Sequence, residues 1–116
     1  MKADYTSGEV VDIDLGNPPN EVKGHEQAYI RPCVVIKSLK AMELAIVVPV
    51  TSSKPKQSYF WVVHIPKGNG GLTMESYVLC HQIRTISFDR IKNRRGKLSS
   101  TDLLKIQSVL TDLLSR

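Results

Sequence analysis

The sequence is poor in long apolar runs, in cysteine and in aromatic residues. Its longest fully apolar run covers only residues 44–48, whereas a membrane-spanning helix needs about 20 apolar residues. The first residues, from Met1 to Tyr5, contain no apolar core of the kind found in a secretion signal. These absences argue against a helical membrane protein and lead us to expect a cytoplasmic one.

Cysteine and histidine are scarce and scattered. The cysteines, Cys33 and Cys80, stand far apart without a C-x-x-C motif, so we expect buried thiols rather than a disulfide framework. The histidines, His25, His64 and His81, lack the spacing of metal ligands. The sequence also has no Walker loop, dinucleotide fingerprint or catalytic-triad signature. We therefore expect neither a metal nor another cofactor.

The residues that are present predict one domain with an uneven charge. The 116 residues fit a single domain, residues 1–116, and 41% hydrophobic with 23% charged residues is ordinary for a folded chain. Basic and acidic side chains number three and six over residues 1–31, five and two over residues 32–83, and eight and three over residues 84–116. A basic C-terminal third suits a polyanionic partner, most often a nucleic acid.

Runs of apolar and β-branched residues predict an antiparallel sheet. Such runs cover residues 8–15, 32–39, 43–51, 59–65 and 76–80, and residues 82–86 continue the last run or form another strand. Pro49 lies near the end of its run, which suits a strand end or an edge strand. Residues 16–31 contain consecutive prolines and a glycine, so they predict a long loop. Residues 90–97 predict a basic connector.

The C-terminal segment has a helical period. Ser99 and Ser100 precede Thr101-Asp102, which together form an N-cap signal. Apolar residues then recur at positions 103, 106, 110 and 113, which predicts an amphipathic helix of about four turns packed on the sheet. The sequence therefore predicts a mainly β fold with a C-terminal helix, as in a small curled barrel.

Three groups of polar side chains could carry chemistry. They are Gly24-His25-Glu26-Gln27 with the nearby Arg31, then Thr51-Ser52-Ser53, then the run from Cys80 to Thr85. A guanidinium fork suits a phosphate, and hydroxyls at a strand end can bond phosphate oxygens. Each group also has an ordinary interpretation: a solvated loop, a salt bridge from Arg31, turn chemistry, or a strand with one wet face.

Short motifs occur in a fixed order along the chain. They are Gly8-Glu9-Val10-Val11, Gly24-His25-Glu26-Gln27, Arg31-Pro32, Val48-Pro49-Val50-Thr51-Ser52 and the run from Tyr77 to Ile86, with Leu98-Ser99 before the last helix. With these motifs the sequence resembles the MazF/PemK family of toxin endoribonucleases (mRNA interferases). The resemblance extends from about Gly8 to Leu114, which is nearly the whole chain.

The resemblance implies a fold, an activity and partners. The fold is an SH3-like barrel of about five to seven antiparallel strands with a C-terminal helix, usually a homodimer. The activity is that of a type II toxin: metal-independent, sequence-specific cleavage of single-stranded RNA that blocks translation. Attack by the RNA's own 2′-hydroxyl leaves a 2′,3′-cyclic phosphate and a 5′-hydroxyl. The other partner is a cognate MazE/PemI-like antitoxin, which blocks the RNA groove with an acidic tail and brings DNA binding to the complex.

The resemblance also implies roles for three residues. Arg31 matches the catalytic arginine of the family and would stabilise the phosphorane, since arginine hardly deprotonates. Thr51 matches the essential threonine and would hold a non-bridging oxygen. Glu26 matches a carboxylate that some members need, so it is one candidate for the general base.

The sequence departs from the family pattern at two positions. His81 stands where many members have an acid, and Leu79 where some have arginine. One hypothesis is that His25 and His81 flank the scissile phosphate as an acid–base pair, because histidine titrates near neutrality. The other is that Glu26 is the base and His81 reads a nucleotide.

Further residues are expected to bind RNA. They are Gln27, Ser52, Lys54, Lys56, Gln82 and Arg84. The lysines would supply salt-dependent affinity, whereas Arg84 is as well suited to a dimer interface. Tyr59 and Phe60 could offer a stacking face, while Trp61 is expected in the core. The alternative function is that of a non-catalytic RNA- or protein-binding member of the same fold, for example a gyrase-targeting CcdB-like toxin.

Overall fold

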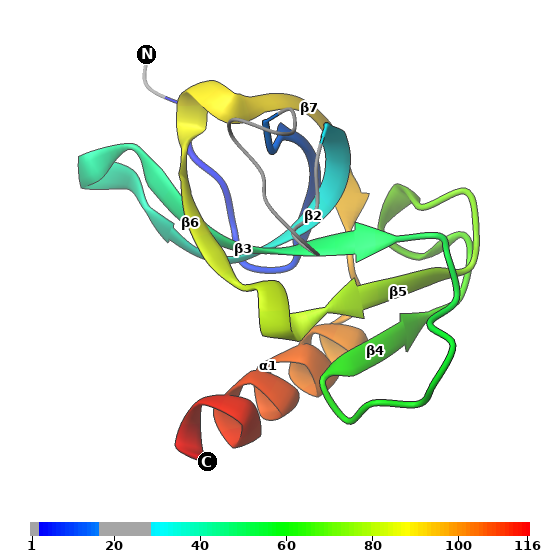
Figure 1. Ribbon diagram of the computed structural model, residues 1–116. Coiled ribbons are helices and arrows are strands. Elements are labelled where there is room, and N and C mark those ends of the chain that lie inside the picture. Colours follow the sequence, from blue (N-terminus) through cyan, green and yellow to red (C-terminus); the bar gives the residue numbers. More distant parts are fainter. Residues whose placement is uncertain (1–2, 17–28) are drawn as a thin grey trace.

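The computed structural model describes residues 3–16 and 29–116 and is mainly an antiparallel sheet with a C-terminal helix (Figure 1). The strands are β1 (Glu9–Asp14), β2 (Ile30–Leu39), β3 (Leu44–Thr51), β4 (Val62–Ile65), β5 (Ser76–Leu79), β6 (Arg84–Ser87) and β7 (Ile91–Lys97). The helix is α1 (Ser100–Ser115), and short 3-10 turns are η1 (Lys40–Met42), η2 (Asn69–Gly71), η3 (Cys80–Gln82) and η4 (Phe88–Arg90). This confirms the predicted fold class. In the described part of the chain, no helix is long and apolar enough to cross a membrane.

The strands follow the order β4-β5-β3-β2-β1-β7, and β6 pairs separately with β3. Strand β3 therefore has two partners on one side. Its first half pairs with β6, and its last residues, Val50 and Thr51, pair with β5. Pro49 lies between these two ladders. Its missing N–H therefore removes no hydrogen bond from the pairing of β3 with β5 or with β6. The sequence predicts Pro49 at a strand end or on an edge strand; it lies two residues before the end of β3, which is an inner strand of the sheet.

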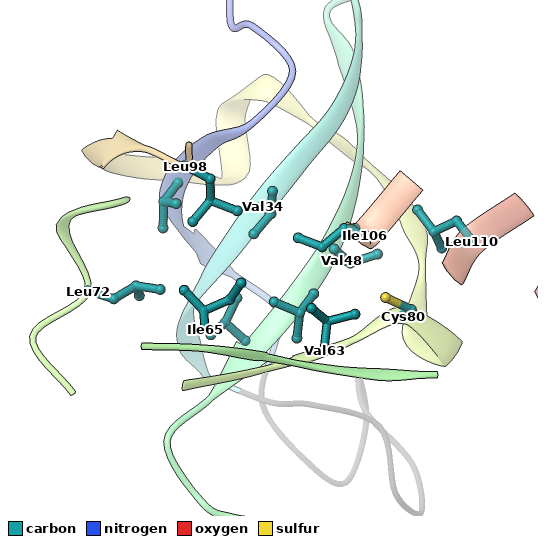
Figure 2. Packing of buried hydrophobic residues seen from close by; sticks show 12 residues of the cluster. Val34, Val48, Val63, Ile65, Leu72, Cys80, Leu98, Ile106 and Leu110 are labelled. Atoms are coloured by element: carbon teal, nitrogen blue, oxygen red, sulfur yellow. The ribbon is translucent and has the colours of Figure 1, made fainter. Parts of the chain in front are cut away.

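Alternate residues of the central strands fill two apolar layers, one on each face of the sheet. Val34 and Val48 face one another across β2 and β3 in the layer that α1 covers, and Val35 and Val47 face one another in the other layer. Figure 2 shows the first layer, in which side chains from the sheet point toward the helix. The period of two along each strand thus gives both faces a core.

The helix begins where the N-cap signal predicts. The Ser99 hydroxyl accepts a hydrogen bond of 3.3 Å from the Asp102 backbone N–H, which satisfies one of the free donors of the first turn. Ile106 and Leu110 are buried on the apolar face of the helix against the sheet. Leu104 lies on the other side and is exposed.

Two predicted boundaries are wrong. Residues 59–61 do not extend β4, because the Val62 N–H bonds to the Tyr59 carbonyl in a turn and the Tyr59 ring stacks on Trp61 at 4.8 Å. Residues 91–97 are not a connector but β7, an edge strand that pairs with β1. Charged side chains commonly protect such an edge, and here they hide the strand pattern.

Candidate functional site

A cleft opens where β2 begins and β3 ends. The polar residues that line it are Arg31, Thr51, Ser52, Thr73, Ser76 and Arg95, and its volume is about 160 Å³. We call it the arginine cleft. Val50 and Leu72 form part of its apolar wall. Its lining residues come from four separate segments of the sequence, so only the fold brings them together.

The register between β2 and β3 brings Arg31 and Thr51 to the same place. Cys33 lies opposite Pro49 and Val34 opposite Val48. The same register, continued by two residues, sets Arg31 opposite Thr51 at the mouth of the ladder. Arg31 is itself the second residue of β2 rather than the last residue of a loop, and its backbone is held against Ile13 of β1.

The hydroxyl of Thr51 is oriented by the turn that follows β3. Its Oγ1 accepts a hydrogen bond of 3.1 Å from the Ser53 backbone N–H. Within the described part of the chain, no acceptor takes the Thr51 O–H, which leaves that proton available to the cleft. A hydroxyl held in this way can donate to an anionic oxygen.

Arg95 enters the arginine cleft from β7, and its side chain is held by Asp12. Its Nε donates to the Asp12 carboxylate at 2.7 Å, and the same carboxylate accepts from the Asn93 amide at 3.2 Å. Asp12 is one-sixth exposed and Arg95 one-third exposed, at 15% and 32%. The carboxylate therefore fixes one edge of the guanidinium and leaves its outer edge toward the cleft.

The wall formed by residues 72–76 is anchored on β7 through glycine. Gly71 has a φ of +74°, and a Cβ there would lie 2.3 Å from the Arg95 carbonyl oxygen. Gly96 packs in turn on the backbone of Gly70. Only glycine allows both the positive φ and this close approach, so the η2 turn lies directly against the part of β7 that carries Arg95.

A second hollow of about 220 Å³ lies beside β4 and β5, and we call it the lysine hollow. Lys54, Lys56, Tyr59, His64 and Tyr77 are among the residues that line it. Tyr77 pairs with Thr51 across β3 and β5 and with His64 across β4 and β5. The lysine hollow and the arginine cleft therefore meet at the end of β3.

The lysine hollow is bordered by a hydrogen-bonded pair, His64 and Glu75. His64 Nε2 lies 2.9 Å from the Glu75 carboxylate, whose other oxygen accepts from the Lys67 backbone N–H at 2.6 Å. That backbone N–H, and after it the His64 side chain, hold the pKa of Glu75 below its ordinary value. The carboxylate is thus charged at neutral pH and fastens the loop between β4 and β5.

His81 lies elsewhere. It belongs to η3, which follows the opposite end of β5 from Ser76, and its ring lies 5.9 Å from that of Trp61. Partial burial lowers the pKa of His81 below its ordinary value, which favours the neutral imidazole at pH 7. The structure does not bring His81 to the arginine cleft.

The other predicted site residues divide into three groups. Ser52 lines the arginine cleft, and Lys54 and Lys56 line the lysine hollow. Gln82 on η3 and Arg84 on β6 lie away from both. The remaining predicted site residues, His25, Glu26 and Gln27, lie outside the described residues.

The predicted thiols and the aromatic segment can also be placed. Cys33 and Cys80 are free and buried, as expected, and burial raises the pKa of the Cys33 thiol to about 12 and that of Cys80 to about 11. Trp61 packs partly buried against the main core. Tyr59 and Phe60 are exposed.

The sequence reading missed Arg95 and its partner Asp12. The sequence predicts a connector over residues 90–97, and a connector assigns no face to its side chains. Residues 91–97 contain a single large apolar residue, Ile91, so no alternation of apolar and polar residues indicates a strand there. With Arg95 included, the arginine cleft holds two guanidinium groups and several hydroxyls. Its described lining residues include no carboxylate or imidazole. Such a set can bind an anion and stabilise added negative charge, and it lacks a group for proton transfer at neutral pH.

Comparison with known proteins gives matches over nearly the whole chain. Residues 6–114 match the family described as PemK-like, MazF-like toxin of type II toxin-antitoxin system. The Endoribonuclease MazF proteins of Staphylococcus epidermidis and Staphylococcus saprophyticus are each 30% identical over 106 residues, which cover 89% of this chain and 85% of theirs.

Solved structures share the fold. MazF from Deinococcus radiodurans superposes with a TM-score of 0.80 at 22% identity and covers 98% of this chain and 99% of its own. A mycobacterial endoribonuclease in complex with its cognate antitoxin gives a TM-score of 0.74 at 17% identity over 96% of this chain and 95% of its own.

Proposed function

Since this chain belongs to the family of PemK-like, MazF-like toxins of type II toxin–antitoxin systems, we propose that it is the toxin of such a system and acts as an endoribonuclease on single-stranded RNA. The observation that carries this proposal is the arginine cleft, which gathers Arg31, Thr51 and Ser52 at the ends of β2 and β3. Cations and hydroxyls in one cleft are what an RNA phosphate needs.

Arg31 and Thr51 have distinct parts in the proposed reaction. Attack by the 2′-hydroxyl adds negative charge to the phosphorus centre, and the Arg31 guanidinium stabilises that charge. The Thr51 O–H donates to a non-bridging oxygen, since its oxygen already accepts from the Ser53 N–H. Neither group serves as a general base, so Arg31 and Thr51 only stabilise the charge on the phosphate and hold it in position.

The proposed general base is Glu26. It takes the proton of the 2′-hydroxyl, while His25 is the candidate acid for the departing 5′-oxygen. The match of Glu26 to a family carboxylate supports this choice, and the described lining of the arginine cleft contains no carboxylate or imidazole. His81, on η3, lies beside Trp61. We therefore propose that His81 contacts a nucleotide outside the cleft and takes no part in proton transfer.

The proposed reaction uses no metal ion. The 2′-oxygen forms a bond to phosphorus, the bond to the 5′-oxygen breaks, and the products are a 2′,3′-cyclic phosphate and a 5′-hydroxyl. The protons move between the RNA and the side chains named above. No group of His, Cys, Asp and Glu residues in the described part of the chain is arranged to hold a metal, and the reaction as proposed needs none.

We further propose that the chain forms a homodimer and that an antitoxin with an acidic segment inhibits it. Lys54 and Lys56 beside the arginine cleft would attract that segment as well as RNA. Family membership supports the antitoxin partner. Chains with the same fold as this one occur in solved complexes with antitoxins.

The test is cleavage of a long single-stranded RNA in EDTA. We expect the wild type to cut at one short sequence and to leave cyclic-phosphate ends. Arg31→Ala should lose this activity, whereas Lys37→Ala, which removes an exposed cation from the same strand, should keep it. No cleavage of several RNAs would overturn the proposal, and inhibition of gyrase by the same sample would then favour the CcdB-like alternative.

A further inference from the structure

We propose that Arg95 is a second phosphate ligand of the arginine cleft, which binds a backbone phosphate next to the scissile one, and that Asp12 positions it. This inference rests on the proposed function, because its ligand is single-stranded RNA. Arg95 is assigned to binding and Arg31 to chemistry.

A β-bulge aims Arg95 into the cleft. On β1, Val10 and Val11 are consecutive, but their partners on β7 are Gly96 and Arg94. Arg95 is therefore the extra residue between two ladder positions. Bulges bend a strand and turn a side chain away from the regular alternation, and they are common beside active sites.

The side chain is held so that it can bind a ligand without further ordering. The Asp12 carboxylate accepts a hydrogen bond from the Arg95 Nε–H. Within the described part of the chain, the Arg95 side chain makes no other hydrogen bond. The two terminal nitrogens are thus left for an anion. A planar guanidinium fixed at one edge matches the two oxygens of a phosphate at its other edge.

The backbone of Arg95 is fixed as well. Its carbonyl oxygen lies so close to Gly71 that no side chain fits there, so the η2 turn supports the bulge from behind. A ligand-binding side chain on a rigid, doubly supported element loses little freedom on binding.

Strand order separates Arg95 from Arg31. Their strands, β7 and β2, flank β1 on opposite sides, so the strands are separated by two strand spacings, about 10 Å. The two residues also lie at different levels along β1, because Arg95 lies between the partners of Val10 and Val11 whereas Arg31 lies opposite Ile13. Asp12, which holds Arg95, pairs with Pro32, while Ile13 pairs with Arg31. Both arginines line the same cleft, one from each of the two strands that flank β1. This spacing suits two phosphates of one strand rather than one phosphate held twice.

The same strand provides a matched control. Between Asp12 and Ile13 the register shifts again, and their partners on β7 are Asn93 and Ile91. Lys92 is thus the extra residue of a second bulge, but it lies with Tyr5 and Arg94 on a separate surface and not in the arginine cleft. Lys92→Gln removes the same charge at an equivalent backbone position.

The experiment measures RNA binding as a function of salt. The probe is a short, mixed-sequence single-stranded RNA that is 2′-O-methylated at every position, so that it cannot be cut. We expect Arg95→Gln to weaken binding about tenfold, as for loss of a hydrogen bond to a charged group. The slope of log K against log salt should become about 0.7 less steep, as for one lost contact to a single strand. Lys92→Gln should leave the slope unchanged, and Arg95→Gln should raise KM for a cleavable RNA by a larger factor than it lowers kcat.

Asp12→Ala distinguishes the positioning of Arg95 by Asp12 from the effect of net charge on RNA binding. The variant is one unit more positive, so long-range attraction alone predicts tighter RNA binding. The proposal predicts weaker binding, and no further loss when Arg95→Gln is added, because the two residues act as one unit. Asp12→Asn serves as the second variant if Asp12→Ala lowers the melting temperature strongly.

The outcomes distinguish this inference from the proposed function. If the wild type cuts RNA but Arg95→Gln binds the probe with the wild-type slope, the Arg95 inference fails and the function stands. If the wild type cuts no RNA yet the slope changes only in Arg95→Gln, the Arg95 site stands and the proposed reaction fails.

Discussion

The two ends of β5 differ in the chemistry that they offer. The end at Ser76 opens on the arginine cleft, with guanidinium groups and hydroxyls. The end at η3 carries His81 against an aromatic cluster, with a pKa lowered by burial. The first end can bind and stabilise negative charge, and the second holds the only described imidazole of the predicted site. The difference teaches that polar residues close together in the family motifs need not share a site in the fold.

The largest effect expected from this comparison is that of Arg31→Ala. Removing the group that stabilises the phosphorane should lower kcat about 10²- to 10³-fold, as for other lost charge-stabilising donors. Single-turnover cleavage of RNA measures this loss. Arg31→Lys should recover part of the activity, since it keeps the charge but not the fork. A loss of less than threefold in Arg31→Ala would place the chemistry outside the arginine cleft.

Thr51→Val should have the next largest effect. The variant keeps the shape of the side chain but loses the O–H that donates to phosphate, so the rate should fall about 10- to 100-fold, the worth of a hydrogen bond to a charged group. Thr51→Ser, which keeps the hydroxyl and its bond from the Ser53 N–H, should stay near the wild-type rate. If the two variants lose the same activity, the hydroxyl is not the reason for the loss.

His81→Ala should change the rate much less than either. Because His81 lies at the other end of β5, we expect the pH–rate profile to keep its shape and kcat to change by about threefold at most. The profile is measured between pH 5 and pH 9. If the pH–rate profile of His81→Ala lost its acidic or its basic limb, His81 would be a proton-transfer group, and the two ends of β5 would not differ in the way described.

Glu75→Gln should give the smallest effect. It changes a residue next to Ser76, at the cleft end of β5, and the quantity that it tests is thermal stability. The pKa of Glu75 is lower in the fold than its ordinary value, so its contribution is present at neutral pH and is lost as the pH falls through the folded pKa. Glu75→Gln should therefore lower the melting temperature slightly at pH 7. The difference from the wild type should vanish at a pH below the folded pKa. Thermal unfolding at several pH values checks this, and a difference that grows on acidification would contradict it.

Much of the fold follows from local patterns. The runs that form β2 and β3 are apolar and β-branched, and the helix carries both an N-cap at Ser99 and a clear apolar stripe. The β7 strand was missed because an edge strand with charged side chains has no apolar alternation. The turn at residues 59–61 was missed because ring packing on Trp61 overrides strand propensity.

The candidate site was less predictable from the sequence alone. The choice of Arg31 and Thr51 came from the resemblance to a family, and their meeting depends on the β2–β3 register. Arg95 could not be chosen from its neighbours, because its direction is set by a bulge against β1. His81 lies in the same family motif as Gln82, but a motif of consecutive residues does not say which end of a strand faces the site.

The pairing of β1 with β7 has a consequence for how the protein is made. It joins residues 9–13 to residues 91–97, which are far apart in the chain, and such long-range pairing is slow to form. A ribosome must deliver the chain through Arg95 before the arginine cleft can close, and through Leu110 before the helix covers the core. A nascent chain therefore carries Arg31 and Thr51 without an assembled cleft. For a protein proposed to destroy RNA, this topology delays activity until β7 and the helix have been synthesised.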